Sequence, residues 1–183
     1  AHQGNDGAIM ITGTGSCGYS YVNGKETMVG GHGFPHGDKG SGAWLGLQAV
    51  KKVLLSLDGL AVKSLMNNIM LNKLDCSNAL EIVEAVAKKT ANFYATLAAV
   101  VFEAAADNDE LALSIVNDGA SYIGQVARRL QRENPPRMSL IGGLNKILIN
   151  YLDHDVAQLL SQPISAPEIG AVLYAKQQTQ QAS

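Results

Sequence analysis

Three glycine-rich segments hold residue types that suit a phosphorylated or hydroxylated ligand. The first is Gly13-Thr14-Gly15-Ser16, which follows a short apolar run over residues 8–12. A tight turn of this composition can direct consecutive backbone N–H groups and two hydroxyls at an anion, as glycine-rich loops do with phosphate. An ordinary hairpin turn would use the same residue types, so this segment alone leaves both interpretations open.

The spacing of Gly13, Gly15 and Gly18 also matches G-x-G-x-x-G, the fingerprint of dinucleotide-binding βαβ units. That fingerprint requires a helix directly after the loop, because the helix N-terminus binds the pyrophosphate. Here the next segment, Tyr19–Val22, alternates and ends at Asn23-Gly24, which is typical of a strand entering a hairpin. The sequence therefore argues against a dinucleotide-binding fold. It also lacks the catalytic and metal motifs that follow the glycine loop of protein kinases.

The second segment, Gly30–Gly42, contains six glycines, two histidines and one aspartate. Loops so rich in glycine lose much conformational entropy on ordering, which favours a role in close approach of the backbone to a ligand. Asp38 is the strongest candidate in it, because a carboxylate accepts hydrogen bonds from substrate hydroxyls. His32, His36 and Asp38 are also metal-ligand types, but the chain offers nothing to complete a set, and ordinary loop polarity explains the histidines as well.

The third segment is an apolar run, Ser139–Ile141, that enters the pair Gly142-Gly143 and then a helical pattern. Paired glycines allow a flat ring or a ribose to approach the backbone at a helix N-terminus. A plain strand-to-helix turn is the alternative for this segment.

The elements that must position these segments fall into two groups. Three strands are expected over residues 8–12, 17–22 and 26–30 as an antiparallel meander, followed by helices capped in one case by Asp75 or Ser77. The later elements are helices over 43–57, 61–73, 81–86, 89–106, 109–132 and most of 145–178, and a strand over 137–141. No internal repeat or linker interrupts them, so we predict one α+β domain over residues 1–183.

Composition excludes several classes of protein. The chain has 183 residues, a formal net charge of −2 and a pI near 6.1, which argues against nucleic acid as a partner. No apolar run approaches the ~20 residues of a membrane span, so no membrane association is expected. Cys17 and Cys76 are too few for a disulfide framework or a zinc site, which favours a reduced cytoplasmic location. Alanine-rich segments near residues 98–106 permit close helix contacts, in a monomer core or in a homodimer.

The three glycine-rich segments, taken in their order along the chain, resemble those of a known family. Residues 9–16, residues 31–42 and residues 141–144 are similar to the C-terminal lobe of N-acetylglucosamine kinases, which belong with the BadF/BadG/BcrA/BcrD-type ATPases in the actin/hexokinase/Hsp70 fold. The closing segment, residues 163–175, is similar to the C-terminal helix of that family. The resemblance implies an α+β domain of the ribonuclease H-like, actin-type ATPase class, with a meander and one later strand packed by many helices.

The resemblance also implies a role for each segment. Gly13, Thr14, Gly15 and Ser16 would form a phosphate loop that grips the β- and γ-phosphates of ATP, with Mg²⁺ held mainly through the nucleotide. Gly31, His32 and Asp38 would line an amino-sugar pocket, in which Asp38 bonds the sugar hydroxyls. Gly142 and Gly143 would border the adenosine. The implied reaction is ATP-dependent phosphorylation of an amino sugar at its 6-hydroxyl, with N-acetylglucosamine first and glucosamine next.

The sequence departs from the pattern of this family at two positions. The family usually has an acidic residue where Lys39 stands and often tryptophan where His32 stands, and both positions would lie near the sugar. In these kinases the catalytic aspartate, which accepts the proton of the 6-hydroxyl, precedes the point that corresponds to Ala1. We therefore expect no catalytic base within this chain. We also expect the chain to be one lobe of a two-lobe kinase and to have little activity alone.

Two other functions compete with the kinase interpretation. One is an ATP-driven activator of a partner enzyme on the same fold, which would hold an iron–sulfur cluster with clustered thiolates. Cys17 and Cys76 form no such motif. The other is a non-catalytic sensor of sugar or nucleotide, for which Lys39 and His32 are the motivation.

Overall fold

A computed structural model describes residues 1–181 of the chain. Its sheet begins with three antiparallel strands, β1 (Gly7–Thr12), β2 (Ser16–Val22) and β3 (Lys25–Gly30). Both turn residues between β2 and β3 have positive φ, 51° at Asn23 and 78° at Gly24, as this dipeptide predicts. A fourth strand, β4 (Met138–Ile141), pairs with β1 in parallel, and the strand order is β3-β2-β1-β4. The predicted meander and later strand are confirmed.

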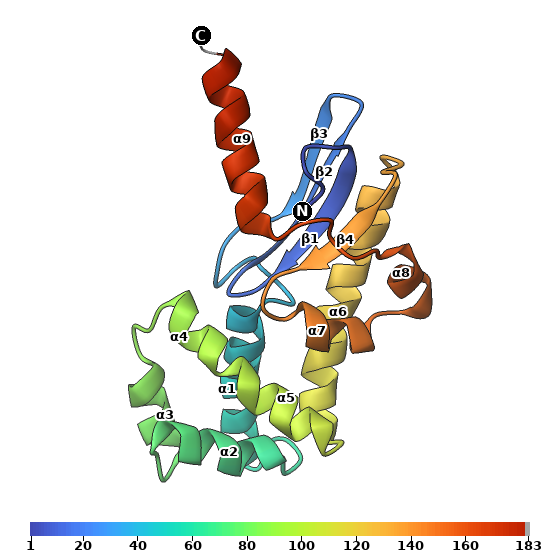
Figure 1. The fold of residues 1–183 in the computed structure, drawn as a ribbon. Helices are drawn as coiled ribbons and strands as arrows, with labels where there is room; N and C mark the ends of the chain where they lie inside the picture. Colours follow the sequence, from blue (N-terminus) through green and yellow to red (C-terminus); the bar gives the residue numbers. More distant parts are fainter. Residues whose placement is uncertain (182–183) are drawn as a thin grey trace.

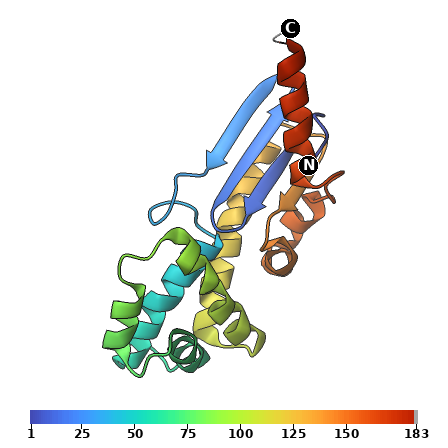
Figure 2. The same ribbon diagram turned by 60° about the vertical axis from the view of Figure 1, so that its left-hand side comes forward.

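The helices form a second layer that lies below the sheet in Figures 1 and 2. They are α1 (Gly42–Leu57), α2 (Leu65–Leu74), α3 (Ala79–Val86), α4 (Ala91–Thr96), α5 (Ala98–Ala106) and α6 (Glu110–Gln131). The long helix α6 belongs to both layers, because it packs on α1 and α5 at one end and on the first three strands at the other. It therefore fixes the sheet relative to the helices.

Strand register decides which side of the sheet α6 covers. Met10 pairs with Gly18 and is fully buried on the covered side. A Cβ atom on Gly18 would lie 2.5 Å from a methyl of Val126 and 2.9 Å from a methyl of Leu130, both on α6. Glycine is therefore what allows the helix to pack this closely on β2.

Two sequence predictions about the helices are wrong in detail. The single helix expected over residues 89–106 is divided into α4 and α5 at Leu97, whose N–H donates to the carbonyl of Tyr94. The third helix is capped by Asn78, whose side chain accepts from the N–H of Glu81. Asp75 instead ends α2 in the left-handed conformation, with φ 53°.

One hydrophobic core continues from the sheet into the helical layer, and it includes the buried side chains of Met10, Leu45, Val100 and Ile123. The alanine-rich face of α5 lies in this core, since Ala98 and Ala104 are buried and α5 packs on α1 and α6. Within the described residues no helix is both long enough and apolar enough to cross a membrane.

The chain after β4 forms three short helical elements and one longer helix. They are α7 (Asn145–Leu148), η1 (Ile149–Tyr151), α8 (His154–Leu159) and α9 (Pro167–Gln181). Arg128 on α6 anchors this region by ion pairs with Asp153 at 2.7 Å and Asp155 at 2.8 Å. Helix α9 begins four residues after the expected start at residue 163 and projects past the sheet (Figure 1).

Candidate functional site

The turn between β1 and β2 lies against the start of α1. The carbonyl of Gly13 accepts from the N–H of Gly42 at 2.7 Å, and the carbonyl of Thr14 accepts from the N–H of Ala43 at 3.3 Å. Ser41 caps the same helix, because its hydroxyl accepts from the N–H of Trp44. These bonds occupy the first N–H groups of α1 and turn the carbonyls of residues 13 and 14 toward the helix. An anion at this turn would therefore meet backbone and hydroxyl groups of the turn itself.

Ser16 joins this turn to the glycine-rich loop that follows β3. Its buried hydroxyl donates to the carbonyl of Lys39 at 2.8 Å, and its carbonyl accepts from the N–H of Gly31 at 3.2 Å. The loop is also attached at its middle, where the rings of Phe34 and Tyr94 lie 5.1 Å apart between centroids. Both ends of the loop and its middle are therefore held by separate contacts.

Asp38 lies directly over the turn. Its backbone is left-handed, with φ 57°, and its carboxylate accepts from the N–H of Gly33 at 3.2 Å. A Cβ atom on Gly15 would lie 2.8 Å from the second carboxylate oxygen of Asp38. A side chain at position 15 would therefore displace the carboxylate of Asp38 from its place over the turn.

These residues surround an open pocket of about 340 Å³. Six residues that the sequence nominated line it, namely Gly13, Thr14, Gly15, Ser16, Gly31 and Asp38. Three further lining residues were not nominated: Ile11, Cys17 and Met28. Ile11 and Cys17 are paired across β1 and β2, on the side of the sheet opposite α6. Strand alternation could have found them, because every second residue of these strands faces that side.

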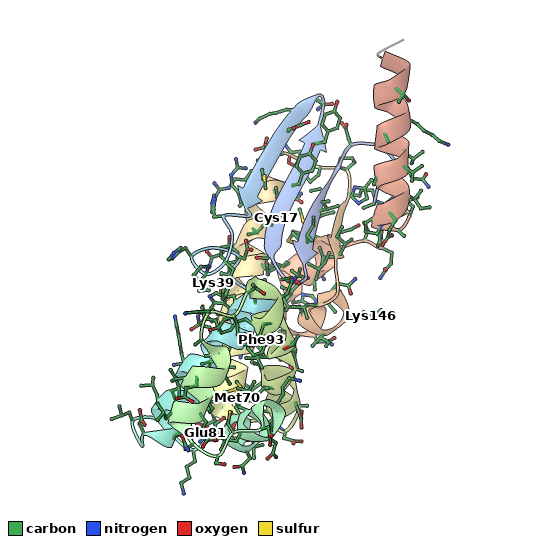
Figure 3. The ribbon with its side chains drawn as sticks, turned by 90° about the vertical axis from the view of Figure 1, so that its left-hand side faces the viewer. Cys17, Lys39, Met70, Glu81, Phe93 and Lys146 are labelled. Carbon is green, nitrogen blue, oxygen red and sulfur yellow. The ribbon has the colours of Figure 1, made fainter. Side chains whose placement is uncertain are left out.

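The thiol in the pocket is held in its protonated form. Burial raises the pKa of Cys17, and the nearby carboxylate of Asp38 raises it further. Figure 3 shows Cys17 on the sheet and Lys39 nearer to the helical layer. The side chain of Lys39 pairs with Asp118 on α6 at 2.7 Å. The pocket lining thus combines an apolar wall, a glycine-rich turn and one carboxylate.

The remaining nominated residues lie beside the pocket and not in its lining. His32 is exposed in the loop next to Gly31. Gly142 and Gly143 follow β4, and because β4 runs parallel to β1 the ends of the two strands are neighbours. The N–H of Leu144 donates to the carbonyl of Thr12 at 3.1 Å, which joins this glycine pair to the residue before the turn.

The described residues, 1–181, contain no group of three or more histidine, cysteine, aspartate or glutamate side chains that could hold a metal ion. His32, His36 and Asp38, whose residue types allowed a metal site, therefore do not form such a group.

The fold and this loop arrangement define an ATPase domain of the actin-like class. The chain belongs to the BadF/BadG/BcrA/BcrD ATPase family, whose model matches residues 1–175. The sequence is 32% identical over 176 residues to the glucosamine kinase GspK of Vibrio cholerae serotype O1, a match that covers 96% of this chain and 59% of that protein.

Two solved structures are similar in fold. A Chromobacterium violaceum protein described as an N-acetylglucosamine kinase superposes with a TM-score of 0.86 at 30% identity, over 93% of this chain and 59% of that one. A Porphyromonas gingivalis protein of the same description superposes with a TM-score of 0.66 at 22% identity, over 93% and 60%. The chain therefore spans about three fifths of the length of the relatives that it matches, and the fold class predicted from the sequence is confirmed.

Proposed function

We propose that this chain is the C-terminal lobe of an ATP-dependent amino-sugar kinase, and that it supplies the phosphate turn and part of the sugar pocket. The observation that carries the proposal is the convergence of Gly13–Ser16 and Asp38 on one pocket of about 340 Å³. Membership of an ATPase family and the similarity to proteins named as glucosamine and N-acetylglucosamine kinases support it. N-acetylglucosamine is the first candidate substrate and glucosamine the second.

In this proposal each part of the pocket has one task. The N–H of Gly13 donates to the carbonyl of Gly15, so the N–H groups of Thr14 and Gly15 and the hydroxyl of Thr14 bind the terminal phosphates of ATP, while the contacts of the turn with α1 keep it rigid. Asp38 accepts hydrogen bonds from sugar hydroxyls and thereby orients the 6-hydroxyl toward the γ-phosphorus. Gly142 and Gly143, at the neighbouring strand end, border the adenosine.

Phosphoryl transfer depends mainly on positioning and on neutralising phosphate charge. The sugar oxygen forms the new bond to phosphorus, the bond to the β-phosphate oxygen breaks, and the hydroxyl proton passes to a base. We propose that this base lies outside residues 1–183, because the task of Asp38 in this proposal is to orient the sugar. Mg²⁺ bound through the nucleotide would neutralise phosphate charge, which fits a pocket whose lining carries only one carboxylate.

The test is a coupled ADP-release assay on the full-length protein with MgATP and a panel of glucosamine, N-acetylglucosamine, N-acetylmannosamine and glucose. We expect turnover with an amino sugar. Asp38→Asn should lower kcat/KM for that sugar by about 10- to 100-fold, because it removes hydrogen bonds to a charged acceptor. Asp75→Asn is the matched control, since Asp75 also has a left-handed backbone, with φ 53° against 57° at Asp38.

Other results would redirect the assignment. Tight binding of sugar or nucleotide without turnover by the full-length protein would favour a sensor on the same fold. Iron-dependent colour with no turnover of any sugar would favour an activator of a partner enzyme. The cytoplasm as the location and a homodimer as the assembly stay predictions for fractionation and for sedimentation.

A further inference from the structure

Lys39 follows Asp38 in the glycine-rich loop, but its side chain leads away from the pocket. Its ammonium pairs with the carboxylate of Asp118 on α6 at 2.7 Å and lies 5.5 Å from the centre of the Trp44 ring on α1. The ammonium of Lys39 therefore connects the loop to both α1 and α6. In Figure 3 Lys39 lies at the junction between the sheet and the helical layer.

The backbone on both sides of Lys39 is attached as well. The carbonyl of Lys39 accepts from the hydroxyl of Ser16, which begins β2 beside the phosphate turn. The next residue, Gly40, packs so closely on α6 that an added Cβ would lie 2.8 Å from the carbonyl of Gly119. Residues 38–40 are thus clamped between the turn and α6, and Asp38 is the member of this group that faces the pocket.

We propose that Lys39 and Asp118 are positioning residues, whose ion pair keeps Asp38 over Gly15 in the geometry that receives the sugar. This inference rests on the proposed sugar-kinase function and adds two residues that touch no substrate. It also explains how a lysine is accommodated beside a sugar pocket: its charge is directed to α6 and not to the ligand. The ion pair connects positions 79 residues apart in the sequence.

Exposure of the pair makes its action sensitive to salt. The side chain of Lys39 is 38% exposed and that of Asp118 is 56% exposed, so ions in solution reach both. Screening weakens such exposed pairs as ionic strength rises. We therefore expect the KM for the sugar to rise with potassium chloride concentration in the wild-type protein, and to change less in Asp118→Asn.

The experiment compares Asp118→Asn, Lys39→Met and Lys39→Arg with wild type in the full-length protein. Lys39→Met should raise the KM for the sugar about three- to thirtyfold, which is the combined range of an exposed ion pair and a cation–π contact, whereas Asp118→Asn keeps the ring contact and should raise it by up to about fivefold. The KM for MgATP and kcat should stay within about twofold, because the pair contributes equally to binding of the sugar in the ground state and in the transition state. Lys39→Arg keeps the charge and the ring contact, so its sugar KM should match wild type.

Lys25→Met is the matched control. Lys25 forms an ion pair of similar length, 2.8 Å to Glu133, and it also connects a sheet residue to a residue beside α6. Its loss removes a lysine and an ion pair without touching the glycine-rich loop, so the sugar KM should not change. An equal rise in this control would overturn the inference.

Hydrogen exchange separates this inference from the proposed function. Amides of residues 31–41 should exchange faster in Asp118→Asn and Lys39→Met than in wild type, whether or not the protein phosphorylates any sugar. Unchanged exchange in this segment refutes the positioning role. If the wild-type protein turns over no sugar but the variants exchange faster, the kinase proposal is refuted. The role of the Lys39–Asp118 pair in holding residues 38–40 is then still established.

Discussion

Gly142 offers the sharpest test of how the strand ends are assembled. Its φ of 103° lies in a region that side-chain-bearing residues rarely adopt. An added Cβ atom would collide with the carbonyl oxygen of Thr12 and lie 2.8 Å from its carbonyl carbon. That carbonyl also accepts from the N–H of Leu144 at 3.1 Å, so it has little freedom to move away. Gly143 has no atom within 4 Å of its Cβ position.

The size of the effect follows from two costs. A residue other than glycine in such a backbone conformation costs about 1–3 kcal/mol. Insertion of a methyl against a packed backbone costs about another 1–3 kcal/mol. Gly142→Ala should therefore lower the free energy of unfolding by about 2–6 kcal/mol, a large part of the ~5–15 kcal/mol that stabilises an ordinary domain. In a domain of this size the melting temperature should fall by at least about 4 °C.

Thermal unfolding followed by circular dichroism measures this loss for Gly142→Ala and Gly143→Ala side by side. Urea denaturation gives the free energies of unfolding, which are compared directly when the m-values of the two variants agree. The alanine at position 143 should change the melting temperature by less than about 2 °C, because surface substitutions away from special contacts are usually close to neutral. Equal melting temperatures for the two variants would refute the reasoning. In that case the collision at Thr12 would not describe the folded protein.

Two further predictions concern packing and pH. Gly18→Ala should lower the free energy of unfolding, measured by urea denaturation, by about 1–3 kcal/mol, because the added methyl meets Val126 and Leu130. Wild-type stability in this variant would contradict the close packing of α6 on β2. Burial, and secondarily Arg137, lowers the pKa of His2 below its ordinary 6.5 in the folded state. The neutral imidazole therefore contributes fully to the stability of the fold above pH 6.5, and this contribution is lost as the pH falls through the folded-state pKa. His2→Gln should flatten this dependence in melts from pH 7.5 to 5, and an unchanged slope would show that His2 is not its source.

Local patterns in the sequence were sufficient for the strands and for the identity of the loops. The alternation in β2 and the Asn23-Gly24 dipeptide act within a few residues, so the hairpin could be predicted without knowledge of the rest of the chain. The glycine-rich loop was predictable for the same reason, because only close backbone approach or unusual φ explains such a density of glycine. The order of these segments was then enough to suggest the family.

Details of the helices depended on neighbours distant in the sequence. The break at Leu97 separates two segments that each have good helical composition, and both resulting helices, α4 and α5, pack on α1. The cap at Asn78 was missed because Asp75 and Ser77 are equally good capping types, and only the path of the chain decides which side chain reaches a free N–H.

Some residues of the candidate site could likewise be predicted from the sequence, and others could not. Composition and order pointed to Gly13–Ser16 and Asp38, whose chemistry is evident from their residue types. Strand alternation indicates that Ile11, Cys17 and Met28 share one side of the sheet, but only the cross-strand register in the tertiary structure places them in one wall of the pocket. The pairing of Lys39 with Asp118 spans 79 residues and leaves no local signal, because it arises from packing. A residue's type states which bonds it can form, and the fold decides which partner lies within reach.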